Sequence, residues 1–242
     1  MAGPAYRHRR TQKGRAKPRR KFKSRCARKT FTRSPYQSQQ ILPLLQIKKL
    51  RYADTASLTI NAAFTAQKKY SLNGLYDPDI TGGGHQPLGF DQMMLLYNQY
   101  CVLGAKIHIR MRAGSTGNTY PMNLIGEATQ LTSLQYSSGS QALEKPTCKM
   151  ITQNTSASNV YNPEKHMTFW FSAKRHFRAN NRKDLISVNH YNGDSSGNPD
   201  QQVFFYLTYQ GQNMQQTTAL LYMDVVLEYI AVFHDPKQLH QS

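Results

Sequence analysis

The amino-acid sequence predicts an all-β protein: a single antiparallel jelly roll, built as a two-sheet, eight-stranded sandwich with long loops, behind a disordered basic N-terminal arm. Two observations predict the sandwich and a third predicts the arm. Apolar and polar residues alternate with a period of two in five separate segments, as in strands that bury one face. The connectors are long and rich in Gly, Ser, Asn and Pro, which favours a jelly roll over a barrel closed by tight hairpins. Basic residues are concentrated at one end of the chain.

The predicted arm, residues 1–43, holds most of the net charge. The chain has 31 Lys and Arg against 13 Asp and Glu, a net charge of +18. Fourteen of these bases precede residue 34, and the first acid in the chain is Asp54. Repulsion between like charges and the lack of an apolar face predict that the arm stays disordered until a polyanion neutralises it. The predicted phosphate contacts are Arg7, Arg9, Arg10, Lys13, Arg15, Lys17, Arg19, Arg20, Lys21, Lys23, Arg25, Arg28, Lys29 and Arg33.

Two further features of the arm concern its partners. Arg outnumbers Lys nine to five, which suits bidentate pairing with phosphate, and four interleaved aromatic residues suit stacking on unpaired bases. The dense cluster from Lys17 to Lys23 also fits a nuclear-localisation signal, so nuclear import receptors are a second expected partner. An anionic cell-surface attachment factor is a third.

Residues 44–242 form the predicted shell domain. Strands with clear alternation are predicted at residues 57–64, 103–112, 166–173, 203–209 and 223–233, and shorter ones at 68–73, 122–129, 144–151 and 185–189. Helices are predicted only at residues 90–100 and 137–143. The residues expected in the sandwich interior include Leu103, Ile107, Ile109, Val225, Leu227 and Tyr229, because their alternation is unbroken and the opposite faces carry charge.

Two basic groups in the body are secondary candidates for binding nucleic acid or another polyanion. The first lies on the polar face of the 103–112 strand and contains Lys106, Arg110 and Arg112, beside His108. The second follows the 166–173 strand and contains Lys174, Arg175, Arg178, Arg182 and Lys183. The second group fits either the lining of an inner surface or a solvated loop.

Enzymatic chemistry has little support in the sequence. The nucleophile-elbow, zinc-protease and phosphate-loop motifs are absent, and the eight histidines lack metal-ligand spacing. Asp77 and Asp79 flank a proline and fit a capped turn better than an acid–base pair. Cys26, Cys101 and Cys148 form no CxxC pair and are expected to be reduced thiols. No apolar run reaches about 18 residues. We therefore expect no enzyme activity, no metal or other cofactor, and no membrane span.

One segment resembles a known family. Residues 73–79 (NGLYDPD), residues 84–92 (GHQPLGFDQ), and then Tyr97, Tyr100, Val102 and residues 104–107 (GAKI) resemble the capsid proteins of circovirus-like viruses, whose circular single-stranded DNA encodes a replication initiator. The resemblance implies a jelly roll that assembles into a small T=1 icosahedral shell around single-stranded DNA, with the arm inside. It also implies location in the virion, and in the host nucleus during assembly.

The same resemblance suggests subunit contacts. In the family this segment belongs to the shell, so the residues implied at subunit interfaces are Asp77, Pro78, His85, Pro87, Phe90 and Tyr97. Phe90 and Tyr97 are expected on a short helix among exposed loops, where changes would spare folding. The run Gly82–Gly84 departs from the expected pattern and loosens this connector.

Two alternatives remain beside the single-stranded DNA virus. A capsid protein of a small RNA virus would need the same arm and the same sandwich. A cellular nucleic-acid-binding protein would need the arm, but its near-neutral body of strands would lack a purpose. For a shell of about 60 copies, the arms would carry on the order of 840 positive charges and neutralise a similar number of phosphates.

Overall fold

The computed structural model describes residues 42–60, 65–113, 121–133, 139–154, 164–211 and 219–238. Contacts divide the chain into two units, residues 1–39 and 40–242, and the described ranges all belong to the second unit. The fourteen bases of the predicted arm therefore lie outside the described residues, and their roles stay predictions.

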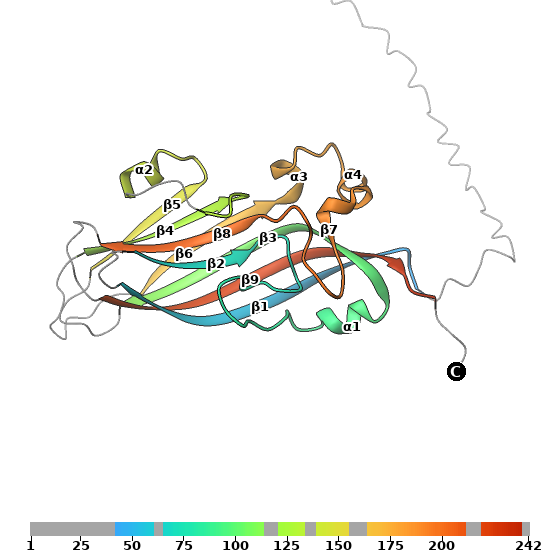
Figure 1. The fold of residues 1–242 in the computed structure, drawn as a ribbon, viewed down its shortest axis with the longest axis horizontal. Helices are drawn as coiled ribbons and strands as arrows, with labels where there is room; N and C mark the ends of the chain where they lie inside the picture. Colours follow the sequence, from blue (N-terminus) through green and yellow to red (C-terminus); the bar gives the residue numbers. More distant parts are fainter. Residues whose placement is uncertain are drawn as a thin grey trace, which may run out of the picture. The chain divides into compact units, whose positions relative to one another are not determined.

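Two antiparallel sheets face each other across the core of this unit (Figure 1). One sheet has the order β1-β9-β3-β6, formed by Leu45–Ile60, Ala219–Pro236, Tyr97–Ala113 and Lys165–Ser172, with the two-residue β7 (Asn192–Gly193) on β3. The other has the order β2-β8-β4-β5, formed by Thr65–Ser71, Phe204–Gly211, Pro121–Thr129 and Cys148–Asn154. Early strands pair with late ones in a nested series: β1 with β9, β2 with β8, β3 with β6 and β4 with β5. This nesting is a jelly roll, and the predicted fold class is confirmed.

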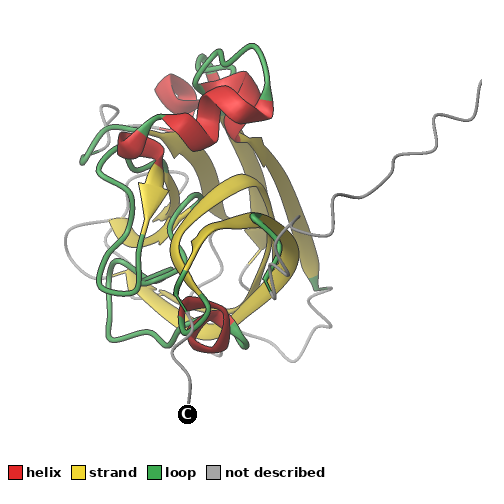
Figure 2. Ribbon diagram, turned by 90° about the vertical axis from the view of Figure 1, so that its right-hand side faces the viewer, coloured by secondary structure: helices red, strands yellow, loops and turns green. Residues whose placement is uncertain are grey.

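Within the described ranges, four short helices and one 3-10 helix lie between the strands, at Phe90–Met94 (α1), Gly139–Leu143 (α2), Ala173–His176 (α3), Arg182–Ser187 (α4) and Asn189–Tyr191 (η1). Figure 2 shows the strands curving around the core and the helices lying outside them. No helix in the described ranges is long and apolar enough to cross a membrane.

Some predicted boundaries are wrong. The helix predicted at residues 90–100 ends at Met94, because Tyr97 and Tyr100 join a ladder with β9 and bury their rings. The strand predicted at 185–189 is instead the end of α4, which starts at a reciprocal cap between Asn181 and Asp184. The first strand begins twelve residues earlier than predicted, at Leu45 rather than residue 57.

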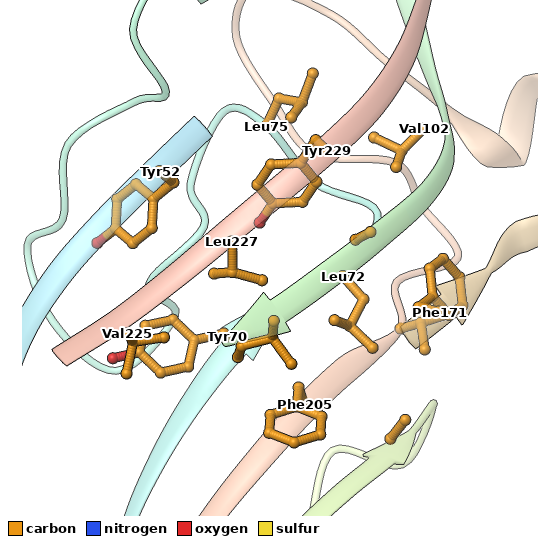
Figure 3. Packing of buried hydrophobic residues seen from close by; sticks show 14 of the residues in the cluster. Tyr52, Tyr70, Leu72, Leu75, Val102, Phe171, Phe205, Val225, Leu227 and Tyr229 are labelled. Atoms are coloured by element: carbon orange, nitrogen blue, oxygen red, sulfur yellow. The ribbon is translucent and has the colours of Figure 1, made fainter. Parts of the chain in front are cut away.

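The inner faces of the two sheets form one hydrophobic core (Figure 3). Ile107, Ile109, Val225, Leu227 and Tyr229 are buried as predicted. Leu103 is only half-buried, because a register shift between Val102 and Gly104 interrupts the alternation of β3. Two tyrosine hydroxyls inside the core have backbone partners: the Tyr229 hydroxyl donates to the Ser71 carbonyl over 2.6 Å, and the Tyr100 hydroxyl accepts from the Leu75 N–H over 3.0 Å. The buried Tyr209 hydroxyl has no hydrogen-bond partner among the described residues.

Candidate nucleic-acid and assembly surfaces

Most acidic residues of the subunit form ion pairs or hydrogen bonds within it. All 13 lie in the described ranges. Six pair with a Lys or Arg: Asp54 and Asp79 with Lys68 at 3.5 and 2.7 Å, Glu127 with Lys145 at 3.0 Å, Glu164 with Arg110 at 3.0 Å, Asp224 with Arg112 at 2.9 Å, and Glu228 with Arg51 at 2.5 Å. Four more have polar partners: Asp184 with Asn181, Asp194 with Ser196, Asp200 with His190 and Asp235 with Asn98. Bases outside these pairs therefore have little internal counter-charge.

The face of the β1-β9-β3-β6 sheet that points away from the core, here called the outer sheet face, carries both signs of charge. Strand register sets Arg51, Glu228, Lys106 and Trp170 in one row across all four strands. A second row contains Thr55, Asp224, Arg110 and His166. Hydrogen bonding from Arg51 lowers the pKa of Glu228, which keeps this carboxylate ionised beside its partner. Two of the three bases predicted to contact a polyanion on this face, Arg110 and Arg112, thus already hold carboxylates.

The second predicted group is arranged differently. Lys174, Arg175, Arg178, Arg182 and Lys183, here called the helical cluster, come from α3, α4 and the turn between them (Figure 1). All five are exposed, and none forms an ion pair with a residue in the described ranges. The one acid among them, Asp184, accepts a hydrogen bond from the Asn181 N–H and so caps the N-terminus of α4. Five positive charges, none of them in an ion pair with a described residue, therefore face the single negative charge of Asp184 on a small surface.

Arg178 occupies a conformation that L residues rarely adopt. Its φ is 54°, in the left-handed region, directly after the end of α3. Glycine is the usual residue at this position of a helix end, and a side chain there costs about 1–2 kcal/mol. Arg178 therefore adds a cation to the helical cluster, but its left-handed backbone conformation destabilises the fold.

A partly buried ion cluster that the sequence did not reveal links the two sheets. Lys68 on β2 lies between Asp54 of β1 and Asp79 of the connector, and the Tyr70 hydroxyl donates to Asp54 over 2.8 Å. Asp79 also accepts from the Thr81 N–H and hydroxyl, which agrees with the predicted capped turn. The only sequence signal was the placement of Lys68 on the same face of its strand as Tyr70. This cluster holds the 72–89 connector against the sandwich.

The residues implied at subunit interfaces divide by burial. Phe90 and Tyr97 are 0% and 1% exposed, so the expectation that they lie among exposed loops and can change without affecting folding is wrong. The ring of Phe90 packs edge-on against Tyr100, and the Tyr97 hydroxyl donates to the Pro43 carbonyl. Pro78 and Pro87 are also buried, whereas Asp77 is half-buried. His85 is exposed, with its ring 4.7 Å from that of Tyr52. Asp77 and His85 stay candidates for subunit contact.

The described cysteines and carboxylates show no arrangement for catalysis. Burial raises the pKa of the Cys101 thiol to about 12 and that of Cys148 to about 11, so both are protonated near neutral pH. Both are free thiols. Within the described ranges, no three His, Cys, Asp or Glu side chains gather as metal ligands.

Comparisons with known proteins yield a likeness in fold. No family model and no curated protein matches the sequence. A mud crab tombus-like virus structure is 15% identical, with a TM-score of 0.45, over 84% of this chain and 96% of that chain. A giant freshwater prawn (Macrobrachium rosenbergii) nodavirus particle is 12% identical, with a TM-score of 0.43, over 82% and 97%. A T=1 subviral particle of a Penaeus vannamei nodavirus capsid protein deletion mutant is 14% identical, with a TM-score of 0.41, over 78% and 96%.

These solved structures are of a tombus-like virus and two nodaviruses. They give no support to the expectation of a single-stranded DNA virus. At such low identity the likeness concerns architecture alone.

Proposed function

We propose that this chain is the capsid subunit of a small icosahedral virus, and that it packages a single-stranded genome through its basic arm. The observation that carries the proposal is the segregation of charge. A jelly-roll body whose carboxylates are mostly paired follows an N-terminal segment with 14 bases and no acid.

Because the arm charges repel one another, a shell of such chains needs a polyanionic partner. A closed shell of about 60 such chains would gather on the order of 840 arm charges in one volume, and the bodies have few free carboxylates to neutralise them. A polyanion of comparable charge removes the repulsion and is itself condensed. Assembly and packaging are then one process, in which neither the empty shell nor the free genome is as stable as the particle.

The helical cluster is proposed as the second contact with the polyanion. Its five exposed bases are free of ion pairs in the described ranges, and the planar fork of arginine pairs with phosphate in two-point geometry. Arg110 and Arg112 are weaker candidates, because binding a phosphate there would first break pairs with Glu164 and Asp224.

The chemistry of the genome has two candidates. The resemblance of residues 73–107 supports single-stranded DNA, with assembly in the host nucleus. A small RNA virus is the alternative, and it fits the solved structures named above better. Phosphate contacts alone do not distinguish DNA from RNA, because both nucleic acids carry the same backbone charge.

Sedimentation and nuclease protection test the proposal together. The full-length protein expressed in cells should sediment as particles of megadalton mass that protect nucleic acid from added nuclease. Deproteinised contents that resist RNase and are degraded by a single-strand DNase identify DNA, and the opposite pattern identifies RNA. A monomer that binds nucleic acid without forming particles would contradict the capsid proposal and favour a cellular nucleic-acid-binding protein.

We also propose that the arm directs nuclear import. Five bases fall within the seven residues from Lys17 to Lys23, the density expected of a localisation signal. A fluorescent fusion of residues 1–40 should accumulate in nuclei, and changing these five bases to Ala should abolish accumulation. Diffuse cytoplasmic fluorescence of the unmodified fusion would refute this role.

A further inference from the structure

An open pocket of about 460 Å³ lies on the outer sheet face, and its walls come from β1, β6 and β9. The lining includes Trp170, Ile230, Lys49, Arg51 and Glu228. Trp170 belongs to the row that contains Arg51, Glu228 and Lys106, while Lys49 and Ile230 belong to the next row with Gly104. A Cβ on Gly104 would lie 4.0 Å from the indole ring of Trp170, so the glycine leaves the space beside the ring open.

Trp170 is the only tryptophan of the chain and is 56% exposed. It makes no ring contact or hydrogen bond with another residue in the described ranges, unlike Phe169 on the same strand, which packs on Phe205. An aromatic face of this size is costly to leave in water, and tryptophan is typical of sites that bind another molecule.

The charge around the pocket indicates what that molecule is. Arg51 pairs with Glu228, and the charge of the neighbouring Lys106 also lowers the pKa of Glu228. Lys49 has no ion pair with a described residue. Glu228 is the only carboxylate in the lining. The site therefore combines a bare aromatic face with three cations, Lys49, Arg51 and the adjoining Lys106, against the single carboxylate of Glu228. This excess of positive charge beside an aromatic ring suits a flat ring attached to negatively charged groups. A second copy of this chain is poorly suited, since ten of its 13 acids are already engaged.

We propose that this pocket, here called the tryptophan pocket, holds an unpaired nucleobase of the packaged strand. The base stacks on Trp170, and Lys49 and Lys106 contact the adjoining phosphates. Stacking of one open face on a protein ring requires a base that is free of its duplex neighbours, so the pocket selects single-stranded segments. This inference rests on the proposed packaging function and specifies where on the body the genome is held.

The single tryptophan makes the test direct, because all indole fluorescence comes from the pocket. Full-length protein, stripped of copurified nucleic acid at high salt, is titrated with hexathymidylate and with an abasic deoxyribose-phosphate hexamer of the same charge. Both should bind, since the 14 bases of the arm can contact the phosphates of either oligomer. Hexathymidylate should quench the Trp170 emission, and the abasic hexamer should leave it nearly unchanged.

Variants of Trp170 test whether this residue is responsible for the base-dependent affinity. Trp170→Ala should weaken binding of hexathymidylate about tenfold and leave binding of the abasic hexamer unaltered. Trp170→Phe should restore most of the affinity. Tyr222→Ala is the matched control, because Tyr222 is an aromatic residue 46% exposed on the same face, in the row of Arg112 rather than that of Trp170. It should bind both oligomers as the wild type does.

The outcomes separate this inference from the packaging proposal. If neither oligomer binds the wild type, packaging by this chain is contradicted. If both bind but emission changes equally or not at all, the tryptophan pocket is contradicted and packaging stands. If Trp170→Ala prevents particle formation while base-dependent affinity is unchanged, Trp170 is a subunit contact and the inference is overturned.

Discussion

The outer sheet face and the helical cluster hold similar residues and differ in what surrounds them. Arg110 and Arg112 lie on a sheet, where cross-strand register brings carboxylates from the neighbouring segments within 3.0 Å. Lys174, Arg175 and Arg178 stand on a short helix and a turn, where no strand supplies a partner. Counting bases along the sequence therefore does not find a polyanion site. The local supply of carboxylates, set by register, decides whether a cation is available.

The largest expected effect concerns the arm, the extreme case of uncompensated charge. Deleting residues 1–34 should leave a folded body with nearly no copurified nucleic acid, because the deletion removes 14 bases and spares β1 and Pro43. Circular dichroism reports the fold, and the ratio of absorbance at the nucleic-acid and protein maxima reports the cargo. A full-length control with these bases changed to Gln should behave like the deletion. Undiminished cargo in either variant would show that the body alone packages the genome.

The next effect is on stability and concerns two buried side chains of β3. Ile107→Ala should lower the free energy of unfolding by about 2–5 kcal/mol, because it leaves a cavity in the core. Tyr97→Ala should also lower the free energy of unfolding, by about 3–5 kcal/mol, because the Tyr97 ring is buried. Denaturant unfolding of disassembled subunits measures both. A Tyr97→Ala subunit as stable as the wild type would contradict the placement of this ring.

A comparison of salt dependence tests the two basic surfaces directly. Changing all five bases of the helical cluster to Ala should reduce the magnitude of the slope of log affinity against log salt by about 3.5, at roughly 0.7 per phosphate contact on a single strand. Changing Arg110 and Arg112 to Ala should leave the slope nearly unaltered, because their charges are already balanced. If both variants change the slope equally, Arg110 and Arg112 leave their carboxylate partners and contact phosphates when the nucleic acid binds.

Arg178 alone should show opposite effects on stability and binding. Arg178→Gly relieves the left-handed backbone and should stabilise the free subunit by about 1 kcal/mol, while it weakens binding to single-stranded nucleic acid slightly. Arg178→Ala is the control that loses the charge and keeps the strain. Thermal unfolding and filter binding report the two quantities. If Gly destabilises the subunit, the side chain of Arg178 is holding α3 in place.

The smallest effect is on pH dependence. Hydrogen bonding from Arg51 lowers the pKa of Glu228 in the folded state, so this pair adds stability above the usual glutamate pKa and loses it as the pH falls through the lowered value. Both side chains are well exposed, and the contribution is small. Glu228→Gln should flatten this part of the acid unfolding curve. A curve of unchanged shape would show that the pair contributes nothing measurable.

The sequence predicted the sandwich well because alternation over long strands is a strong signal. Val225, Leu227 and Tyr229 have no break in their pattern, and they are buried. It failed where a local pattern had two explanations: the spacing of Met93, Leu96, Tyr97 and Tyr100 fits a helix, but pairing with β9 determines the outcome. The sequence could not predict which bases form ion pairs, because the partners of Arg51 and Arg112 are 177 and 112 residues away in the chain.

The nested strand order has a consequence for synthesis. Leu45, at the start of β1, pairs with His234 near the end of β9, so the first strand made finds its partner only when the last strand has left the ribosome. At roughly 5–20 residues per second, that delay is about 10 to 40 s. The basic segment precedes β1 and is translated before any of the body can close. Nucleic acid therefore has access to it for the whole of that interval, while the surfaces that join subunits do not yet exist. The order of translation separates capture of the strand from closure of the shell.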